Sequence, residues 1–223
     1  DGVGIVYAEY DDDLDIYPHR IMGRIFEKDT LHVNTHDGVR VSLTLSVSNP
    51  GHVFEDVKPH IGDLNGDGLN DVAVIETSLT HGASLAIYTV KRGMLVKIAQ
   101  TPFVGRRNRW YAQLGFGDFN NDGALDVAFV DRPHLARIIR VYSIKDGRFQ
   151  EIAAAEGVTN HAIGDEIIWG GVRRCSDRDE IVLKNQTSGN FMAIWINAKD
   201  NRFTGRDLGV RGGPAHFYQA LQC

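Results

Sequence analysis

The sequence of 223 residues contains only two cysteines, six prolines and three tryptophans. It also lacks a long hydrophobic run, because no apolar stretch approaches the roughly 20 residues that cross a bilayer as a helix. Its positive and negative charges nearly balance, with a formal net charge of −5. A chain of this kind offers no broad basic face for a phosphate backbone. We therefore expect no membrane span and no nucleic-acid partner.

Common catalytic motifs are missing as well. The sequence has no G-x-S-x-G, no H-E-x-x-H and no glycine-rich phosphate loop. Its nine histidines are scattered, and no serine has an evident histidine partner in the sequence. We name no catalytic residue, and we favour a non-enzymatic role over an enzymatic one.

What the sequence has in quantity is short apolar runs separated by turns. Apolar residues make up 43% of the chain and charged residues 24%, which is typical of a globular domain. Residues 83–99 and 136–153 each contain two such runs, joined by predicted hairpin turns at 91–93 and 145–147. This pattern predicts an all-β fold, with a short helix near residues 215–221 as the exception.

Two stretches of the chain are nearly alike: IGDLNGDGLNDVAVI at residues 61–75 and FGDFNNDGALDVAFV at residues 116–130. Each has oxygen-bearing side chains at loop positions one, three, five and nine, glycine at six and a backbone carbonyl at seven. This oxygen-only set suits Ca²⁺, and the lack of Cys and His disfavours softer metals. We predict two calcium sites per chain, with these ligands: Asp63, Asn65, Asp67, Leu69 and Asp71 in the first loop, and Asp118, Asn120, Asp122, Ala124 and Asp126 in the second.

The alternative for each loop is an ordinary solvated turn, since Asp, Asn and Gly are the common turn formers. Two copies, each followed at once by an apolar run, favour the metal. A helical EF-hand loop would place Glu at position twelve, where this chain has Val74 and Phe129. The flanking element is therefore predicted to be a strand, so that the ion braces a β-sheet.

The pattern G-D-x-N-x-D-G-x-x-D-V-A-x followed by an apolar strand resembles the FG-GAP/VCBS repeat. That resemblance implies calcium-binding loops on the blades of a β-propeller, as in integrin α-subunit heads. Over nearly the whole chain, the sequence is most similar to small exported FG-GAP/VCBS-repeat proteins of alphaproteobacteria. The similarity is carried by HVFEDV at 52–57, RNRW at 107–110, DRPHLAR at 131–137 and TNHAIG at 159–164. It implies export but names no activity.

A third, eroded copy of the loop is GGVRRCSDRDEIVL at residues 170–183, about 55 residues beyond the second. Its ligand positions hold Gly171, Arg173, Cys175 and Asp179. Because a glycine and an arginine replace two ligands, this copy should bind no calcium.

Self-similarity at this period indicates a repeat array. We predict a single domain over residues 1–223: a small β-propeller of about four repeats, in which a strand at residues 2–10 closes the ring. The predicted repeats span roughly residues 19–50, 53–100, 109–152 and 161–206. A β-sandwich is the alternative.

The two cysteines carry a further prediction. Cys175 lies in the third copy and Cys223 is the last residue, so a disulfide would tie the C-terminus to the final repeat. Two free thiols are the alternative. A disulfide and calcium sites both suit an oxidising, calcium-rich compartment. Because the chain begins at Asp1 without Met or an apolar leader, we expect a mature or trimmed product in the periplasm or outside the cell.

For function, we expect a calcium-stabilised, non-catalytic interaction or scaffold module of the cell envelope that binds a protein or a glycan. A sugar-binding lectin is one alternative, and a hydrolase or lyase with a site at the propeller centre is another. Five side chains form a possible ligand surface, although packing or turn bonding would also explain them: Arg109, Trp110, His134, His161 and His19.

Overall fold

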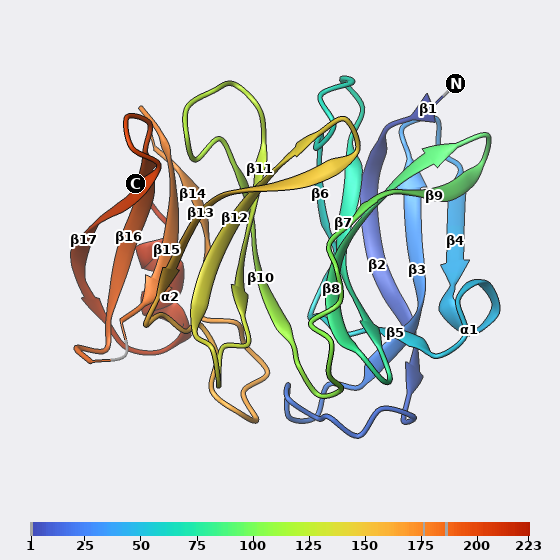
Figure 1. Cartoon of the computed structure of the whole chain (residues 1–223), viewed down its shortest axis with the longest axis horizontal. Helices are drawn as coiled ribbons and strands as arrows, with labels where there is room; N and C mark the ends of the chain where they lie inside the picture. The colour runs from blue at the N-terminus through green and yellow to red at the C-terminus, as the bar shows by residue number, and fades with distance from the viewer. Residues whose placement is uncertain (1, 176, 186) are drawn as a thin grey trace. The chain divides into compact units, whose positions relative to one another are not determined.

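The computed structural model describes residues 2–175, 177–185 and 187–223, and Figure 1 shows their path. These residues form seventeen strands and two short helices, so the predicted all-β class is confirmed. They divide into two compact units. The first unit is Asp1–Tyr111, Ile144–Phe149 and Ile163–Glu166, and the second is Ala112–Ser143, Gln150–Ala162 and Ile167–Cys223.

The first unit contains one nine-stranded sheet and the short helix α1 (Leu45–Ser48). The main order is β1-β8-β7-β5-β3-β2, while β4 pairs with β3, β6 with β7 and β9 with β8. The strands are β1 (Gly2–Val3), β2 (Ile5–Leu14), β3 (Glu27–Thr35), β4 (Arg40–Thr44), β5 (His52–Phe54), β6 (His60–Gly62), β7 (Asp71–Ser78), β8 (Gly82–Lys91) and β9 (Met94–Gln100).

Strands β7 and β8 lie side by side within this sheet, and both of their faces are covered. Every residue of β7 is buried, and so is every residue of β8 except Lys91. Val74 and Ala86 from these strands join Phe54 and Leu31 in one hydrophobic cluster. The buried apolar runs seen in the sequence therefore form the core of the first unit.

The second unit contains the helix α2 (Pro214–Ala220) and two four-stranded sheets, except for Tyr111 and the hairpin end Ile144–Phe149, which belong to the first unit. In each sheet the strands follow one another in chain order. The first sheet has β10 (Tyr111–Gly117), β11 (Asp126–Asp131), β12 (Ile138–Lys145) and β13 (Arg148–Glu156), and the second has β14 (Gly170–Arg174), β15 (Asp179–Lys184), β16 (Asn190–Asn197) and β17 (Arg202–Arg211). Val130 and Ile139 of the first sheet share a hydrophobic cluster with Ile181 and Leu183 of the second.

Both predicted hairpin turns are present. Lys91 pairs with Met94 across the two-residue turn between β8 and β9, where Arg92 and Gly93 have φ angles of 53° and 72°. The residues between β12 and β13 have φ angles of 52° and 69°. Positive φ at both central positions is typical of the type I′ turn, whose twist matches that of paired strands. The predicted helix near the C-terminus is α2.

The limits of the sheets can be set beside those of the predicted repeats. Strands β10–β13 span residues 111–156 and strands β14–β17 span residues 170–211, where repeats were predicted at 109–152 and 161–206. Those predicted at 19–50 and 53–100 share a single sheet, because β5 pairs with β3 on one side and with β7 on the other.

The N-terminal residues also pair differently from the prediction. Strand β1 pairs with β8 and strand β2 with β3, so residues 2–10 extend the sheet of the first unit rather than the last sheet of the chain. The ring arrangement and the extent of the domain stay predictions.

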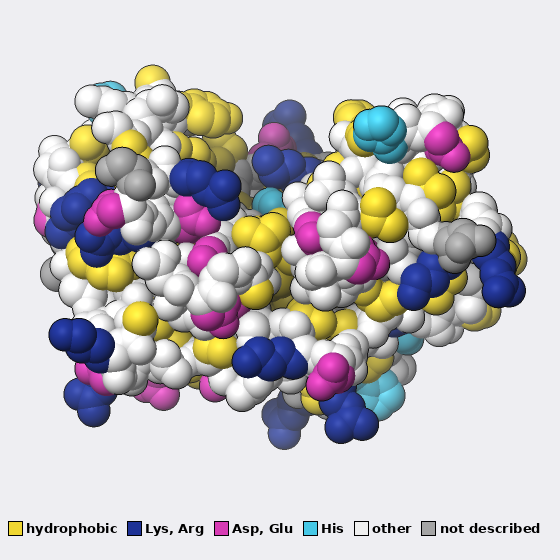
Figure 2. All heavy atoms as spheres, turned by 90° about the horizontal axis from the view of Figure 1, so that it is seen from above, with side chains coloured by type: hydrophobic (Ala, Val, Ile, Leu, Met, Phe, Trp, Pro, Cys, Tyr) yellow, Lys and Arg dark blue, Asp and Glu magenta, His cyan; other side chains and the backbone are white. Residues whose placement is uncertain are grey.

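On the face drawn in Figure 2, charged side chains of both signs are mixed, and Lys and Arg side chains lie among Asp and Glu side chains rather than in a broad area of their own. Within the described residues, no helix is long and apolar enough to cross a membrane.

Candidate metal loops and the disulfide

The two aspartate loops occupy the same place in the chain relative to their strands. The first lies between β6 and β7, and the second lies between β10 and β11. The last ligand of each loop, Asp71 or Asp126, is the first residue of a buried strand and is fully buried itself. Gly68 and Gly123 have φ angles of 84° and 90°, which favour a residue without Cβ. The predicted strand flank is therefore confirmed.

In the first loop, the carboxylates of Asp63 and Asp67 accept backbone N–H groups of the loop itself. Asp63 Oδ1 accepts from Gly66 at 2.9 Å and from Asp67 at 3.1 Å, and its Oδ2 accepts from Gly68 at 3.0 Å. Asp67 Oδ1 accepts from Leu69 at 2.9 Å. These bonds fold the loop around its own side chains.

The second loop repeats this pattern. Asp118 Oδ1 accepts from the backbone of Asp122 at 2.9 Å, and Asp118 Oδ2 accepts from Gly123 at 2.9 Å. Asp122 Oδ1 accepts from Ala124 at 3.0 Å. Two segments of different sequence thus form the same loop, with each oxygen-bearing position in a matching place.

The aspartates that open the strands lie in a negative environment. Burial, and then the charges of Asp67 and Asp63, raise the pKa of Asp71 to about 6. Burial, with the charges of Asp122 and Asp118, raises the pKa of Asp126 to about 7. Asp126 Oδ1 is buried and has no hydrogen-bond partner among the residues that the structure describes.

These residues fit a hard cation in their donor chemistry. A carboxylate has about four lone-pair sites, so accepting two or three N–H groups leaves room for a further partner. The unpartnered Oδ1 of Asp126 is one such site. In each loop the amide of Asn65 or Asn120 donates its N–H to the neighbouring aspartate, at 3.1 Å and 3.0 Å. Among the described residues, no three Asp, Glu, His or Cys side chains are already arranged around a common metal position.

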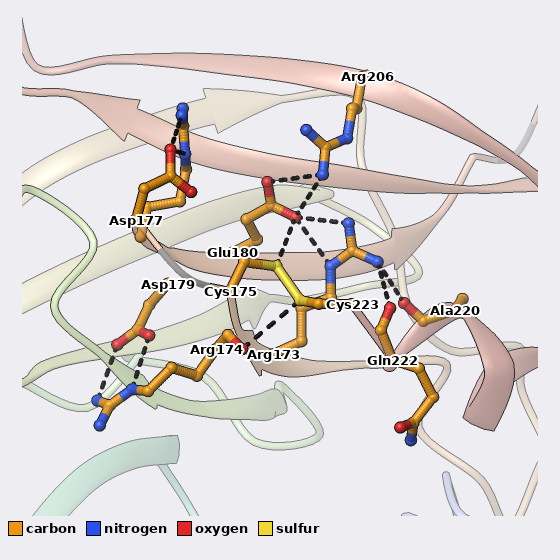
Figure 3. The surroundings of a disulfide bond; sticks show 11 residues. Arg173, Arg174, Cys175, Asp177, Asp179, Glu180, Arg206, Ala220, Gln222 and Cys223 are labelled. Carbon is orange, nitrogen blue, oxygen red and sulfur yellow. Dashed lines mark hydrogen bonds and ion pairs between the residues drawn. A yellow bond between two sulfur atoms is a disulfide. The ribbon is translucent and has the colours of Figure 1, made fainter.

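The third, eroded loop provides a comparison within the same molecule. Asp179 opens β15 and is nearly buried, as Asp71 and Asp126 are in their strands. The guanidinium of Arg174 donates to both of its carboxylate oxygens, at 2.9 Å and 3.1 Å (Figure 3). Here a protein cation lies against the aspartate, whereas no basic side chain neutralises Asp71 or Asp126 among the described residues.

The predicted disulfide between Cys175 and Cys223 is confirmed, with a Cα–Cα distance of 5.7 Å. Arg173, which replaces a loop ligand, is buried and forms an ion pair with Glu180. Its Nη1 also donates to the backbone carbonyls of Ala220 and Gln222, both at 2.9 Å (Figure 3). The C-terminal segment is therefore held to the third loop by a covalent bond and a buried cation.

The residues of the predicted ligand surface in the first unit make internal contacts. Trp110 is buried, and its Nε1 donates to the carbonyl of Glu55 at 2.7 Å. His19 Nδ1 lies 2.5 Å from Oε1 of the same glutamate. Arg109 is half-buried and donates to the carbonyl of Asn108 at 2.7 Å. Each of these three side chains therefore has a partner within the first unit, and the predicted ligand surface stays a prediction.

In the second unit, the structure brings His134 and His161 together. His161 is buried, and its Nδ1 lies 3.1 Å from Nε2 of His134. The sequence did not predict this pair, because the two histidines are 27 positions apart.

Sequence reasoning also missed Arg174 as the partner of Asp179. The signal was present, because two adjacent arginines occupy the copy of the loop that lost its ligands. A basic residue close to a strand-opening aspartate is an ion-pair candidate wherever the acidic neighbours have been replaced.

The structure is thus that of an all-β protein with two similar acidic loops, each of which ends in an aspartate that opens a buried strand. Residues 63–129 match the family model described as an FG-GAP-like repeat, so the predicted resemblance to the FG-GAP repeat is confirmed, while the similarity to exported alphaproteobacterial proteins stays a prediction.

The comparison with solved structures includes the periplasmic gluconolactonase of Pseudomonas aeruginosa. The two structures have a TM-score of 0.46 and 11% sequence identity, over 90% of this chain and 57% of the other. This chain therefore spans little more than half the length of that protein. No curated protein sequence matches this chain.

Proposed function

We propose that the chain is a calcium-stabilised, non-catalytic interaction module that binds a protein or a glycan. One observation carries the calcium part. Three aspartates open strands at matching repeat positions, and of these three only Asp179 faces a guanidinium among the described residues. A cation in each intact loop would neutralise Asp71 and Asp126 as Arg174 neutralises Asp179.

The ligands of each ion would be the predicted loop residues, from Asp63 to Asp71 and from Asp118 to Asp126. Ca²⁺ suits them because it takes six to eight oxygen ligands in flexible geometry, whereas Mg²⁺ demands near-ideal octahedral geometry. Bound calcium would supply positive charge and would cross-link the turn to the first residue of β7 or β11. Loops held in this way on a rigid sheet offer a fixed binding surface.

The cellular location is part of the same proposal. A disulfide persists in oxidising environments such as the periplasm and the cell exterior, and millimolar calcium is found outside the cytosol. We therefore assign the protein to the periplasm or the extracellular space, as an exported protein of the cell envelope.

Calorimetric titration of the metal-free protein tests the calcium sites. We expect two sites for Ca²⁺ per chain, with one lost in Asp67→Ala and the other in Asp122→Ala. Asp15→Ala is the control, because Asp15 forms an exposed ion pair with Arg20 outside both loops. Fewer than two sites in the wild-type protein, or displacement of Ca²⁺ by Zn²⁺ at equal concentration, would contradict the proposal.

A further inference from the structure

A pocket of about 400 Å³ lies beside the second loop, within the second unit. This volume is in the range of small-molecule sites and holds about one or two sugar rings. Aromatic, cationic, acidic and amide side chains all contribute to its lining: Trp195, Arg178, Asp177, Asp118, Asn121 and Asn197.

The aromatic and basic groups of the pocket lie together. Trp195 extends from β16 and is half-buried, and the Arg178 guanidinium lies 4.8 Å from its ring centroid. A cation at this distance is attracted by the electron density of the ring. Arg178 also pairs with the carboxylate of Asp177, whose side chain is 61% exposed. An exposed ion pair contributes little to stability, so Arg178 can exchange this partner for another carboxylate at little cost.

We propose that this pocket binds a carboxylated sugar, a uronate, whose carboxylate pairs with Arg178 and whose ring packs against the edge of Trp195, since the guanidinium groups of Arg178 and Arg206 lie over the indole ring at 4.8 Å and 5.8 Å from its centroid. A guanidinium binds a carboxylate in bidentate fashion, and an indole offers a rigid apolar surface with little entropy loss. Asn121 and Asn197 supply donors and acceptors for the sugar hydroxyls. The proposal rests on the glycan-binding role given above.

The lining groups favour a uronate over two other anions. A phosphate group carries close to two negative charges at neutral pH, and the carboxylates of Asp118 and Asp177 would repel it more than a single carboxylate. An acidic peptide would need an extended groove or a free strand edge for its backbone. The pocket instead presents side-chain amides and carboxylates around a hollow, which suits a ring with several hydroxyls.

The second loop links the pocket to calcium. Asp118 is both a predicted ligand of the ion and part of the pocket wall, and Asn121 belongs to the same loop. Calcium in this loop would offset the charge of Asp118 beside the bound carboxylate. Sugar binding is therefore expected to depend on the second loop and not on the first.

The experiment titrates the calcium-loaded protein with galacturonate, galactose, galactose 6-phosphate and a tripeptide of glutamate, by calorimetry and NMR. We expect galacturonate to bind at least ten times more tightly than the other three. Arg178→Gln and Trp195→Leu should each weaken binding at least tenfold, and Trp195→Phe should weaken it less. Arg211→Gln changes an exposed arginine at the other end of β17, so it is the matched control and should leave binding unchanged.

Two loop variants complete the test. Asp122→Ala should weaken galacturonate binding, whereas Asp67→Ala should not. Equal affinity for galactose, preference for the phosphate or the peptide, or binding that survives Arg178→Gln would overturn the proposal. If the protein binds two calcium ions but no sugar, the proposal for this pocket fails and the calcium function stands. If it binds the sugar but no calcium, the calcium function fails and the pocket stands.

Discussion

At the scale of single residues, Glu76 shows how the first unit accommodates a buried charge. Its side chain is fully buried, and it lies 2.6 Å from His52 Nδ1, 2.7 Å from Lys97 Nζ and 2.6 Å from the Tyr88 hydroxyl. Burial alone would raise its pKa, but the hydrogen bonds from His52, Lys97 and Tyr88 outweigh burial and lower the pKa to about 2.

This pKa shift predicts a pH-dependent contribution to stability. A carboxylate with a depressed pKa in the folded state stabilises the protein above its unfolded pKa, and the contribution is lost as the pH falls through the folded value. The Glu76→Gln variant should therefore lower the free energy of unfolding at pH 7 by about 3 kcal/mol. The difference from wild type should shrink as the pH falls from 4.5 to about 2.

Chemical denaturation of both proteins across this pH range measures the effect. Glu151→Gln is the control, because its ion pair with Arg140 is partly exposed and should contribute less than about 1 kcal/mol. A difference between Glu76→Gln and wild type that stays constant down to pH 2 would show that the charge of Glu76 is not responsible.

At this scale, a local pattern was enough to predict that the two loops share one geometry, while their calcium ligands stay a prediction. The ligand positions of both loops lie within nine consecutive residues, so their shared spacing alone indicates one loop geometry. Trp110 was harder, since its indole is satisfied by the carbonyl of Glu55, which is 55 positions away. Nothing near Trp110 in the sequence distinguishes a buried tryptophan from an exposed platform.

At the scale of elements, the hairpins were predictable and the sheet boundaries were not. Two-residue turns containing glycine fix the pairing of their own strands. Strand β5, however, is only three residues long, and it joins β3 and β7 into one sheet. A strand of this length has no detectable period, so the sequence suggested two separate repeats where the structure has one sheet.

The C-terminal element depends on the disulfide. The bond joins residues 48 positions apart, and closing a loop of this length stabilises a protein by about 4 kcal/mol in the chain-entropy model. Cys223→Ser should therefore lower the melting temperature, and the double variant with Cys175→Ser should match it. Reduction of the wild-type protein should reproduce the same shift.

Arg173 offers a check on this prediction, because its Nη1 holds the carbonyls of Ala220 and Gln222 without any covalent bond. If Arg173 alone fixed the C-terminal segment, Cys223→Ser would melt like the oxidised wild type. Alkylation of two thiols in natively exported protein would also contradict the disulfide and, with it, the assignment to an oxidising compartment.

At the scale of the whole molecule, the stability of both units should depend on the free calcium concentration. The first loop belongs to the first unit and the second loop to the second, so an ion bound in each loop would stabilise its own unit. A ligand that binds only the folded state stabilises it by about 2.7 kcal/mol when its free concentration is 100 times the dissociation constant. Excess chelator should therefore lower the melting temperature of both units.

The variants separate the two contributions. Asp67→Ala should remove the calcium dependence of the first unit, and Asp122→Ala should remove that of the second. Because the loops share no ligand, their effects should be nearly additive. Scanning calorimetry with and without calcium, followed by tryptophan fluorescence to distinguish the units, measures these shifts.

The double variant is the control for these measurements. Its loop turns should remain while its cation sites are lost, so its melting temperature should not respond to chelator. If the metal-free wild-type protein melts as the calcium-loaded one does, the loops are ordinary turns, and Asp71 and Asp126 are accommodated without a cation.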